Sequence, residues 1–268
     1  MAASTLKIGS YNILDQGEVA VSGNPDTGYI VSRLYDWSKN LLWKSSSGGD
    51  GYLFGGDGHI FSDDGFIDQG GSYTFLVTQP TGDIEDVDTL FVTGHNFDGC
   101  TMSWQYSDDG ESWSNAVDSW SQDGNSDITK TLTAANHKHW RLTVAGPPNP
   151  IMCGEIIMTG LYSFNIQRGP SPVHSYVDNV TWSRSIGGQE RGIKLGDKGK
   201  TVAYTLRISA SDLTNLQSVF TDLDGFSRPM LIKDKDDNYR LARFEPPPGE
   251  VYFHNDYTDI NVVIQEMI

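Results

Sequence analysis

Residues 104–113, with the sequence WQYSDDGESW, constrain the fold more than any other part of this chain. Large and small side chains alternate at its start, and an Asp-Asp-Gly turn then separates Tyr106 from Trp113. Alternation is typical of a strand with one buried face, and Asp-Gly supplies the positive φ that a tight hairpin needs. We therefore expect a β-hairpin in which Trp104 and Tyr106 point to one face and Trp113 folds back over the same core.

The rest of the chain also favours β structure, because short alternating runs recur between Gly, Asp, Asn and Pro breaks. The expected strands cover residues 6–14, 29–34, 72–77, 89–94, 101–107, 127–132, 139–145, 155–164, 179–185, 201–208, 229–233, 239–245 and 260–266. One helix is expected over residues 212–223, capped by residues 209–212. Its apolar face consists of Leu213, Leu216, Val219, Phe220 and Leu223.

Charge and composition exclude several classes of protein. Lys and Arg number 19 against 35 Asp and Glu, a net charge of −16, whereas a nucleic-acid binder needs a basic face. The sequence has no apolar run long enough for a membrane span, and its N-terminal residues do not resemble a signal peptide. We therefore expect synthesis in the cytoplasm, no membrane insertion and no nucleic-acid partner. Cys100 and Cys153 are expected to be small buried hydrophobes, with a disulfide between them as the alternative.

A Pro-rich stretch over residues 168–174 (RGPSPVH) predicts a domain boundary, because Pro removes backbone donors and favours extended chain. The predicted domains are an N-terminal arm over residues 1–30, a sandwich over 31–167 and a second domain over 168–268. The arm could pack with the C-terminal domain. The second domain is expected to be a compact sandwich or split barrel with one helix on its side.

Residues 31–165 resemble a discoidin-like (galactose-binding-like) jelly-roll sandwich. The stretches that carry this resemblance are residues 34–37 (LYDW) with 40–42 (NLL), 90–97 (LFVTGHNF), 104–113 with its SDDGESW hairpin, and 140–144 (WRLTV). The resemblance implies a mainly β jelly roll, and it says little about a ligand.

The order of the pieces resembles minor and distal tail proteins of tailed bacteriophages. A GHNF strand and a WRL strand are followed by RSIGG, a strand–helix–strand unit and a hydrophobic last strand. The resemblance implies that residues 170–268 form a tail-tube-like domain that oligomerises around the tail axis, while the sandwich projects outward and sometimes binds carbohydrate. Its implied partners are copies of itself, neighbouring tail proteins and host-surface glycan. Its implied location is the virion tail, assembled in the host cytoplasm.

The sequence nominates no catalytic residue, and we expect that the protein is not an enzyme. Its carboxylates lie mostly in turns, and His137 and His139 are two apart on an expected strand with no third ligand nearby. The Gly-rich segment over residues 48–65 is the one candidate cation site, because Asp57, Asp63 and Asp64 could offer hard oxygen ligands to Ca²⁺. A turn that only packs between strands is the alternative, and no other cofactor is expected.

Carbohydrate binding needs an aromatic platform beside polar side chains, and Trp43, Tyr52, Phe54 and Trp120 fall in expected loops. The remaining tryptophans of the sandwich are expected to fill its core: Trp37, Trp104, Trp113 and Trp140. A basic hairpin with Arg191, Lys194, Lys198 and Lys200 could pair with the acidic face of a neighbouring subunit. A solvated hairpin is the alternative.

Three functions are compatible with these sequence features. The first is a structural component of a phage tail or tail tip, a ring or adaptor around the tail axis, of threefold or sixfold symmetry. The second is a stand-alone carbohydrate-binding module, and the third is a hydrolase appendage.

Overall fold

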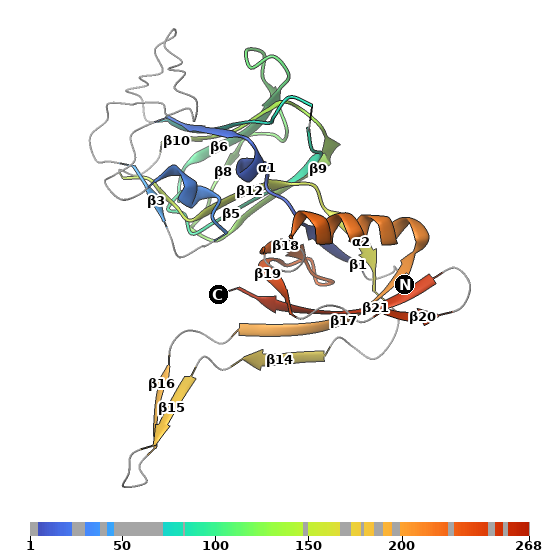
Figure 1. Ribbon diagram of the computed structural model, residues 1–268. Helices are drawn as coiled ribbons and strands as arrows, with labels where there is room; N and C mark the ends of the chain where they lie inside the picture. Colours follow the sequence, from blue (N-terminus) through green and yellow to red (C-terminus); the bar gives the residue numbers. More distant parts are fainter. Residues whose placement is uncertain are drawn as a thin grey trace. The chain divides into compact units, whose positions relative to one another are not determined.

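The computed structural model describes two compact units, which we call the sandwich unit (Tyr11–Leu161) and the C-terminal unit (Met1–Ser10 with Tyr162–Ile268) (Figure 1). No described helix is long and apolar enough to cross a membrane. The described residues are 5–22, 30–37, 42–45, 72–82, 84–146, 150–166, 173–177, 180–184, 190–194, 199–224, 228–245, 250–253 and 257–267.

The sandwich unit is built from two main antiparallel sheets, which confirms the prediction of a mainly β chain with a β-sandwich. The six-stranded sheet contains β2 (Glu18–Val21), β4 (Ser72–Thr78), β10 (His139–Ala145), β6 (Thr101–Ser107), β7 (Ser114–Asn115) and β8 (Trp120–Ser121). The three-stranded sheet contains β12 (Glu155–Thr159), β5 (Val87–Thr93) and β9 (Ile128–Ala135). A short pair is formed by β3 (Trp43–Lys44) and β11 (Met152–Cys153).

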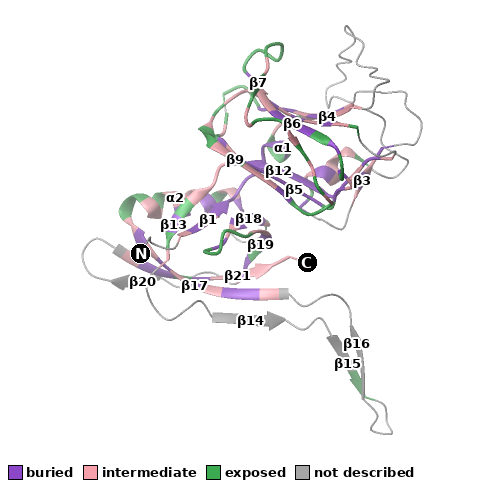
Figure 2. Ribbon diagram, turned by 180° about the vertical axis from the view of Figure 1, so that it is seen from behind, coloured by how far each residue is buried: buried purple, intermediate pink, exposed green. Residues whose placement is uncertain are grey.

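The sandwich core lies between the sheets, on the inward side of each alternating strand. In β10 and β6, Trp140, Leu142 and Trp104 have no exposed surface. The rings of Trp104 and Trp140 are 5.4 Å apart at their centroids. All of β12 and nearly all of β5 is buried, as the purple strands of Figure 2 show. Cys100 and Cys153 are buried free thiols, as expected.

Of two strands predicted near the N-terminus, one is shorter than expected and the other is not a strand. The strand expected over 6–14 ends at Gly9, and α1 (Ile13–Gln16) follows. This helix begins there because the Asn12 side chain accepts the N–H of Leu14 at 3.2 Å. The strand expected over 29–34 is instead a 3₁₀ helix, η1 (Val31–Leu34), with Arg33 N–H donating to Ile30 O.

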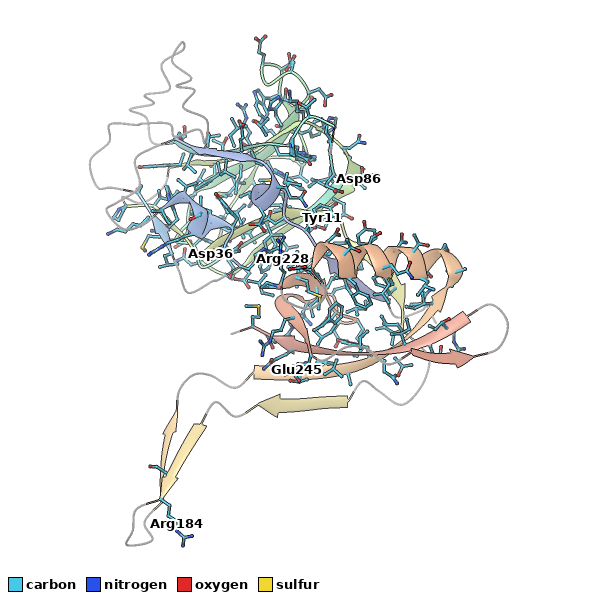
Figure 3. All side chains as sticks on the ribbon, viewed as in Figure 1. Tyr11, Asp36, Asp86, Arg184, Arg228 and Glu245 are labelled. Carbon is cyan, nitrogen blue, oxygen red and sulfur yellow. The ribbon has the colours of Figure 1, made fainter. Side chains whose placement is uncertain are left out.

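The strand expected over 155–164 is interrupted at Gly160. The Tyr11 hydroxyl lies against this glycine, accepts its N–H at 3.1 Å and donates to Asp86 O. Tyr11 and Asp86 are both labelled in Figure 3. A Cβ at position 160 would lie 2.6 Å from the Tyr11 hydroxyl and 2.7 Å from Asp86 O. Only glycine leaves room for this bridge.

The C-terminal unit contains an eight-stranded antiparallel sheet. Its strands in order are β13 (Tyr162–Asn165), β1 (Thr5–Gly9), β18 (Met230–Lys233), β19 (Tyr239–Glu245), β21 (Tyr257–Glu266), β17 (Gly199–Ser209) and β14 (Val173–Val177), with β20 (Glu250–Phe253) on β21. Ile166 also bridges to Leu206 of β17, so the sheet curls back on itself. The strands β15 (Val180–Arg184) and β16 (Glu190–Lys194) form a separate pair.

Helix α2 (Ala210–Asp222) packs on this sheet and agrees closely with the predicted helix. Ser209 caps it in a capping box, in which Ser209 Oγ accepts Asp212 N–H and Asp212 accepts Ser209 N–H. Leu216 and Val219 are fully buried in the core of this unit. Phe220 meets Phe244 of β19 edge to face, with centroids 5.6 Å apart.

The sandwich unit is an insertion in the C-terminal unit. The neighbouring strands β1 and β13 pair directly, with Ile8 opposite Tyr162 and Leu6 opposite Phe164, yet all of the sandwich unit lies between them in the sequence. Leu6, Ile8 and Phe164 are fully buried in the same core as α2. The first strand of the chain is therefore an internal strand of the C-terminal unit.

Candidate functional site

The outward face of the six-stranded sheet carries a continuous row of polar side chains. Arg141 of β10 lies opposite Gln105 of β6, and Gln105 lies opposite Asn115 of β7. Arg141 Nε donates to Gln105 Oε1 at 2.8 Å, and Gln105 Nε2 donates to Asn115 Oδ1 at 2.8 Å. One row further along, Thr143 Oγ1 lies 3.3 Å from Thr74 Oγ1. We call Arg141, Gln105, Asn115 and Trp113 the polar row.

The turn after β6 positions Trp113 in this row. Asp109 Oδ1 accepts the N–H groups of Glu111 and Ser112 and the hydroxyl of Ser107, and these hydrogen bonds hold the pKa of Asp109 well below its usual value. Gly110 adopts a φ of 77° at the tip. The turn is therefore closed by its own side chains, as the Asp-Gly signal predicts.

Trp113 packs on Arg141 rather than in the core. The guanidinium carbon lies 4.0 Å from the centroid of the Trp113 ring, a cation–π contact. Trp113 is half-buried, whereas Trp37, Trp104 and Trp140 are buried. The prediction that Trp113 fills the core was therefore wrong, because the turn leads the chain to the outward side of the sheet.

Burial lowers the pKa of Arg141. The residue is half-buried on the sheet, and no carboxylate of the described residues lies within ion-pair distance of it. By contrast, Arg207 of β17 binds Asp259 through two hydrogen bonds of 2.9 and 3.0 Å. Among the residues that the structure describes, Arg141 is therefore a partly desolvated cation without a counter-ion.

A second cluster lies at the end of the same strands. The rings of Tyr106 and His137 stack at 3.9 Å, and His137 Nδ1 lies 2.9 Å from Asp108 Oδ1. Trp140 Nε1 donates to His137 O at 3.0 Å, and the Gln79 side chain donates to the same oxygen. These contacts connect the turn before β10 to the core. The polar groups of the cluster bind one another.

The aromatic residues predicted for carbohydrate binding are placed differently. Trp43 lies in β3, has no exposed surface and meets Phe75 edge to face at 5.4 Å. The expectation of an exposed loop was wrong for this residue, because its strand pairs with β11. Trp120 in β8 is half-buried under Lys130, whose Nζ lies 4.5 Å from the ring centroid. Tyr52 and Phe54 lie outside the described residues.

The predicted cation ligands Asp57, Asp63 and Asp64 also lie outside the described residues. Within the part of the chain that is described, no group of three or more His, Cys, Asp or Glu side chains is arranged to hold a metal ion. His139 hydrogen-bonds to Thr78 Oγ1 at 3.0 Å, and burial lowers its pKa. Its partner is thus a hydroxyl within the sheet.

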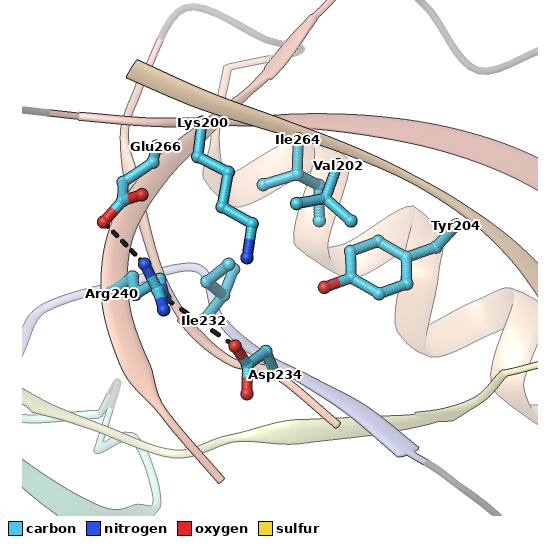
Figure 4. Close-up of a pocket in the computed structure, with 8 residues that line it drawn as sticks. All are labelled: Lys200, Val202, Tyr204, Ile232, Asp234, Arg240, Ile264 and Glu266. Carbon is cyan, nitrogen blue, oxygen red and sulfur yellow. Dashed lines mark hydrogen bonds and ion pairs between the residues drawn. The ribbon is translucent and has the colours of Figure 1, made fainter. Parts of the chain in front are cut away.

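The basic hairpin is described only in part. Arg191 and Lys194 belong to the backbone of β16, and Lys198 lies outside the described residues. Lys200, at the start of β17, lines a small pocket in the C-terminal unit (Figure 4). Arg240 donates to Glu266 at 2.9 Å and lies 3.7 Å from Asp234. Val202, Ile232 and Ile264 form the apolar part of the lining.

No family model matches this sequence, and no curated protein matches it. Among solved structures, the chain is similar to a pectin-binding carbohydrate-binding module, at 14% identity over 53% of this chain and 88% of the module, with a TM-score of 0.37. It is also similar to a chitosan-binding module from a chitosanase/glucanase of Paenibacillus sp. IK-5, at 18% identity over 56% and 98%, with a TM-score of 0.40.

A third similar structure is CpGH89CBM32-5 of Clostridium perfringens, in complex with GalNAc-β-1,3-galactose. It is 13% identical over 55% of this chain and 96% of the module, with a TM-score of 0.40. These similarities concern the fold alone.

Three residues of the polar row were not predicted from the sequence: Arg141, Gln105 and Asn115. The signal was present in part, because strict alternation puts Arg141 and Gln105 on the face opposite Trp140 and Trp104. The register that brings them side by side was not visible, since it depends on the pairing of β6 with β10.

Proposed function

We propose that this chain binds carbohydrate through the polar row of its sandwich unit, and that the C-terminal unit serves as a structural anchor. The observation that carries the proposal is the contact of Trp113 and Arg141 beside two amide side chains on one sheet face. Sugars present hydroxyl groups and apolar C–H faces, so a site needs planar polar side chains beside an aromatic ring. The polar row has both.

Rigidity of the row supports this proposal. Arg141 and Gln105 belong to central strands, and Trp113 follows a turn that is closed by hydrogen bonds. A preorganised site loses less side-chain entropy when a ligand binds. The row is therefore better suited to recognition than long polar side chains on a free loop.

The proposal is tested by glycan-array binding and calorimetry on the native protein and on two tryptophan variants. We expect W113A to weaken binding of any glycan that binds on the array by at least about tenfold, because the ring contact is lost. W120A is the matched control, since Trp120 is also half-buried under a cation, on β8. If binding is lost in W120A and retained in W113A, the binding site lies at β8 instead. An array on which no glycan binds would refute the proposal.

We propose further that the chain is a structural component of a phage tail or tail tip, with the sandwich as an outward decoration. Insertion of the sandwich unit between β1 and β13 supports this role, because the unit could be added without interrupting the curled sheet and its helix. The proposed partners are copies of this chain and neighbouring tail proteins, with Arg191, Lys194, Lys198 and Lys200 at the contact. The proposed location is the virion tail.

Native mass by light scattering, with class averages from negative stain, separates the structural role from a stand-alone module. Closed rings of three or six subunits support the tail role. A monomer that binds glycan and does not bind tail proteins of the same virus supports the stand-alone module instead. A deletion of residues 11–161 closed by a short Gly-Ser linker should retain the assembly and lose the glycan binding.

A further inference from the structure

We infer that the polar row recognises acidic glycans, with Arg141 binding a carboxylate group of the sugar. This inference rests on the proposed carbohydrate binding and adds the chemical class of the ligand. It follows from the charge of Arg141, from the direction of the hydrogen bonds along the row and from the contact of its guanidinium with the Trp113 ring.

The charge of Arg141 is the first argument. The chain has 35 acidic residues for 19 basic ones, so carboxylates are abundant, and yet none of the described ones pairs with this half-buried arginine. A partly desolvated cation without a counter-ion is costly unless a ligand supplies the charge. The pKa of Arg141, which burial lowers, agrees with that arrangement.

The direction of the hydrogen bonds is the second argument. Arg141 Nε donates to Gln105, and Gln105 donates in turn to Asn115, so each accepting oxygen of the row already holds one hydrogen bond. The terminal amino groups of Arg141 and the amide nitrogen of Asn115 donate no hydrogen bond within the described part of the chain. The unused groups are mainly donors, and a ligand that fits them must present acceptors.

The geometry of the guanidinium is the third argument. Its Nε donates to Gln105, and its central carbon lies 4.0 Å from the centroid of the Trp113 ring, so the edge with both terminal amino groups remains for the ligand. An arginine edge binds the two oxygens of a carboxylate through parallel hydrogen bonds. A neutral hydroxyl fills only one of these positions.

The test compares polysaccharides that differ only in charge: polygalacturonate, alginate and hyaluronate against their carboxyl-reduced forms. Calorimetry is done in about 150 mM NaCl, where the Debye length is about 8 Å, so that charges at longer range contribute little to binding. We expect the native protein to bind at least one acidic form about tenfold to a hundredfold more tightly than its reduced form. R141Q should bind the two forms equally, and R141K should retain part of the preference because it keeps the charge without the planar edge.

R243Q is the matched control. Arg243 is exposed, lies in the C-terminal unit and donates to Gln265, so R243Q changes the net charge by the same amount and should keep the preference. Thermal unfolding checks that R141Q is folded. If it is not, R141K is compared with the native protein: a smaller preference for the acidic form supports the inference, and an undiminished preference overturns it. Equal binding of acidic and reduced forms by the native protein, or a preference that survives in both Arg141 variants, overturns the inference while carbohydrate binding stands. Binding of no acidic and no neutral glycan would refute the proposed function itself.

Discussion

Trp104 and Trp140 lie side by side in the sandwich core, with ring centroids 5.4 Å apart, but they differ in one hydrogen bond. The indole N–H of Trp140 donates to His137 O at 3.0 Å. The indole nitrogen of Trp104 is buried and has no hydrogen-bond partner among the described residues. Two side chains of the same type and burial therefore differ in the free-energy cost of burying the indole N–H.

This difference predicts unequal effects of two conservative variants. Both W104F and W140F should lower the free energy of unfolding, because each removes buried surface. W140F should lower the free energy of unfolding by about 1 kcal/mol more than W104F does. The reason is that W140F also removes a hydrogen bond, whereas W104F removes an unsatisfied donor. Denaturant unfolding followed by circular dichroism measures both, and equal losses or a larger loss in W104F would contradict the argument.

His95 should make the sandwich unit sensitive to acid. Its Nδ1 accepts Phe97 N–H at 3.2 Å and its Nε2 lies 2.9 Å from Ser126 O, so the neutral ring suits the folded state. Burial lowers the pKa of His95 below its usual value of 6.5. The unfolded chain therefore binds the proton more readily, and stability that is complete above about pH 6.5 is lost as the pH falls below it.

Urea midpoints measured between about pH 7.5 and about pH 5 test this prediction. H95N should be less stable at neutral pH and should show a shallower loss of stability in acid. The pKa of His139 is also lowered by burial, so H139N serves as a second comparison. A pH profile of H95N that runs parallel to that of the native protein would show that His95 is not responsible.

Gly160 should not tolerate alanine. A Cβ there would lie 2.6 Å from the Tyr11 hydroxyl and 2.7 Å from Asp86 O, so G160A should destabilise the sandwich unit by about 1–3 kcal/mol. The double variant Y11F/G160A should recover only part of this loss, because the clash with the backbone oxygen remains. Thermal unfolding of the two variants and of Y11F alone measures the coupling, and a G160A midpoint equal to the native one would refute the steric argument.

The capping box of α2 should contribute measurably to the stability of the C-terminal unit. S209A removes the acceptor for Asp212 N–H and should cost about 1 kcal/mol, whereas S209G should cost only a few tenths. S218A, a Ser to Ala change within the same helix, is the control. Equal unfolding free energies of S209A and S209G would mean that the cap contributes little.

The elements that the sequence predicted well are those set by local pattern. The strands at Thr101–Ser107 and His139–Ala145 were predicted to the residue, because alternation and the Asp-Gly turn act within a few residues. The helix was predicted to within two residues at its start, since its cap and its apolar face are also local signals.

The elements that were missed depend on distant contacts. Asn12 caps α1 and also binds Ile156 O and Met158 N–H in β12, far along the chain. Trp43 is buried because β3 pairs with β11. The polar row likewise depends on cross-strand register, which alternation alone does not fix. Of the candidate site, the face occupied by Arg141 was predictable and its neighbours across the sheet were not.

The pairing of β1 with β13 has a mechanical consequence. Because the sandwich unit is inserted between these strands, tension applied to the sandwich unit would reach the C-terminal unit through two covalent connections. Each connection enters a hydrogen-bonded strand, and Leu6, Ile8 and Phe164 hold these strands in the core. A module at a chain end would transmit the same force through a single linker, and breakage of that linker would detach the module.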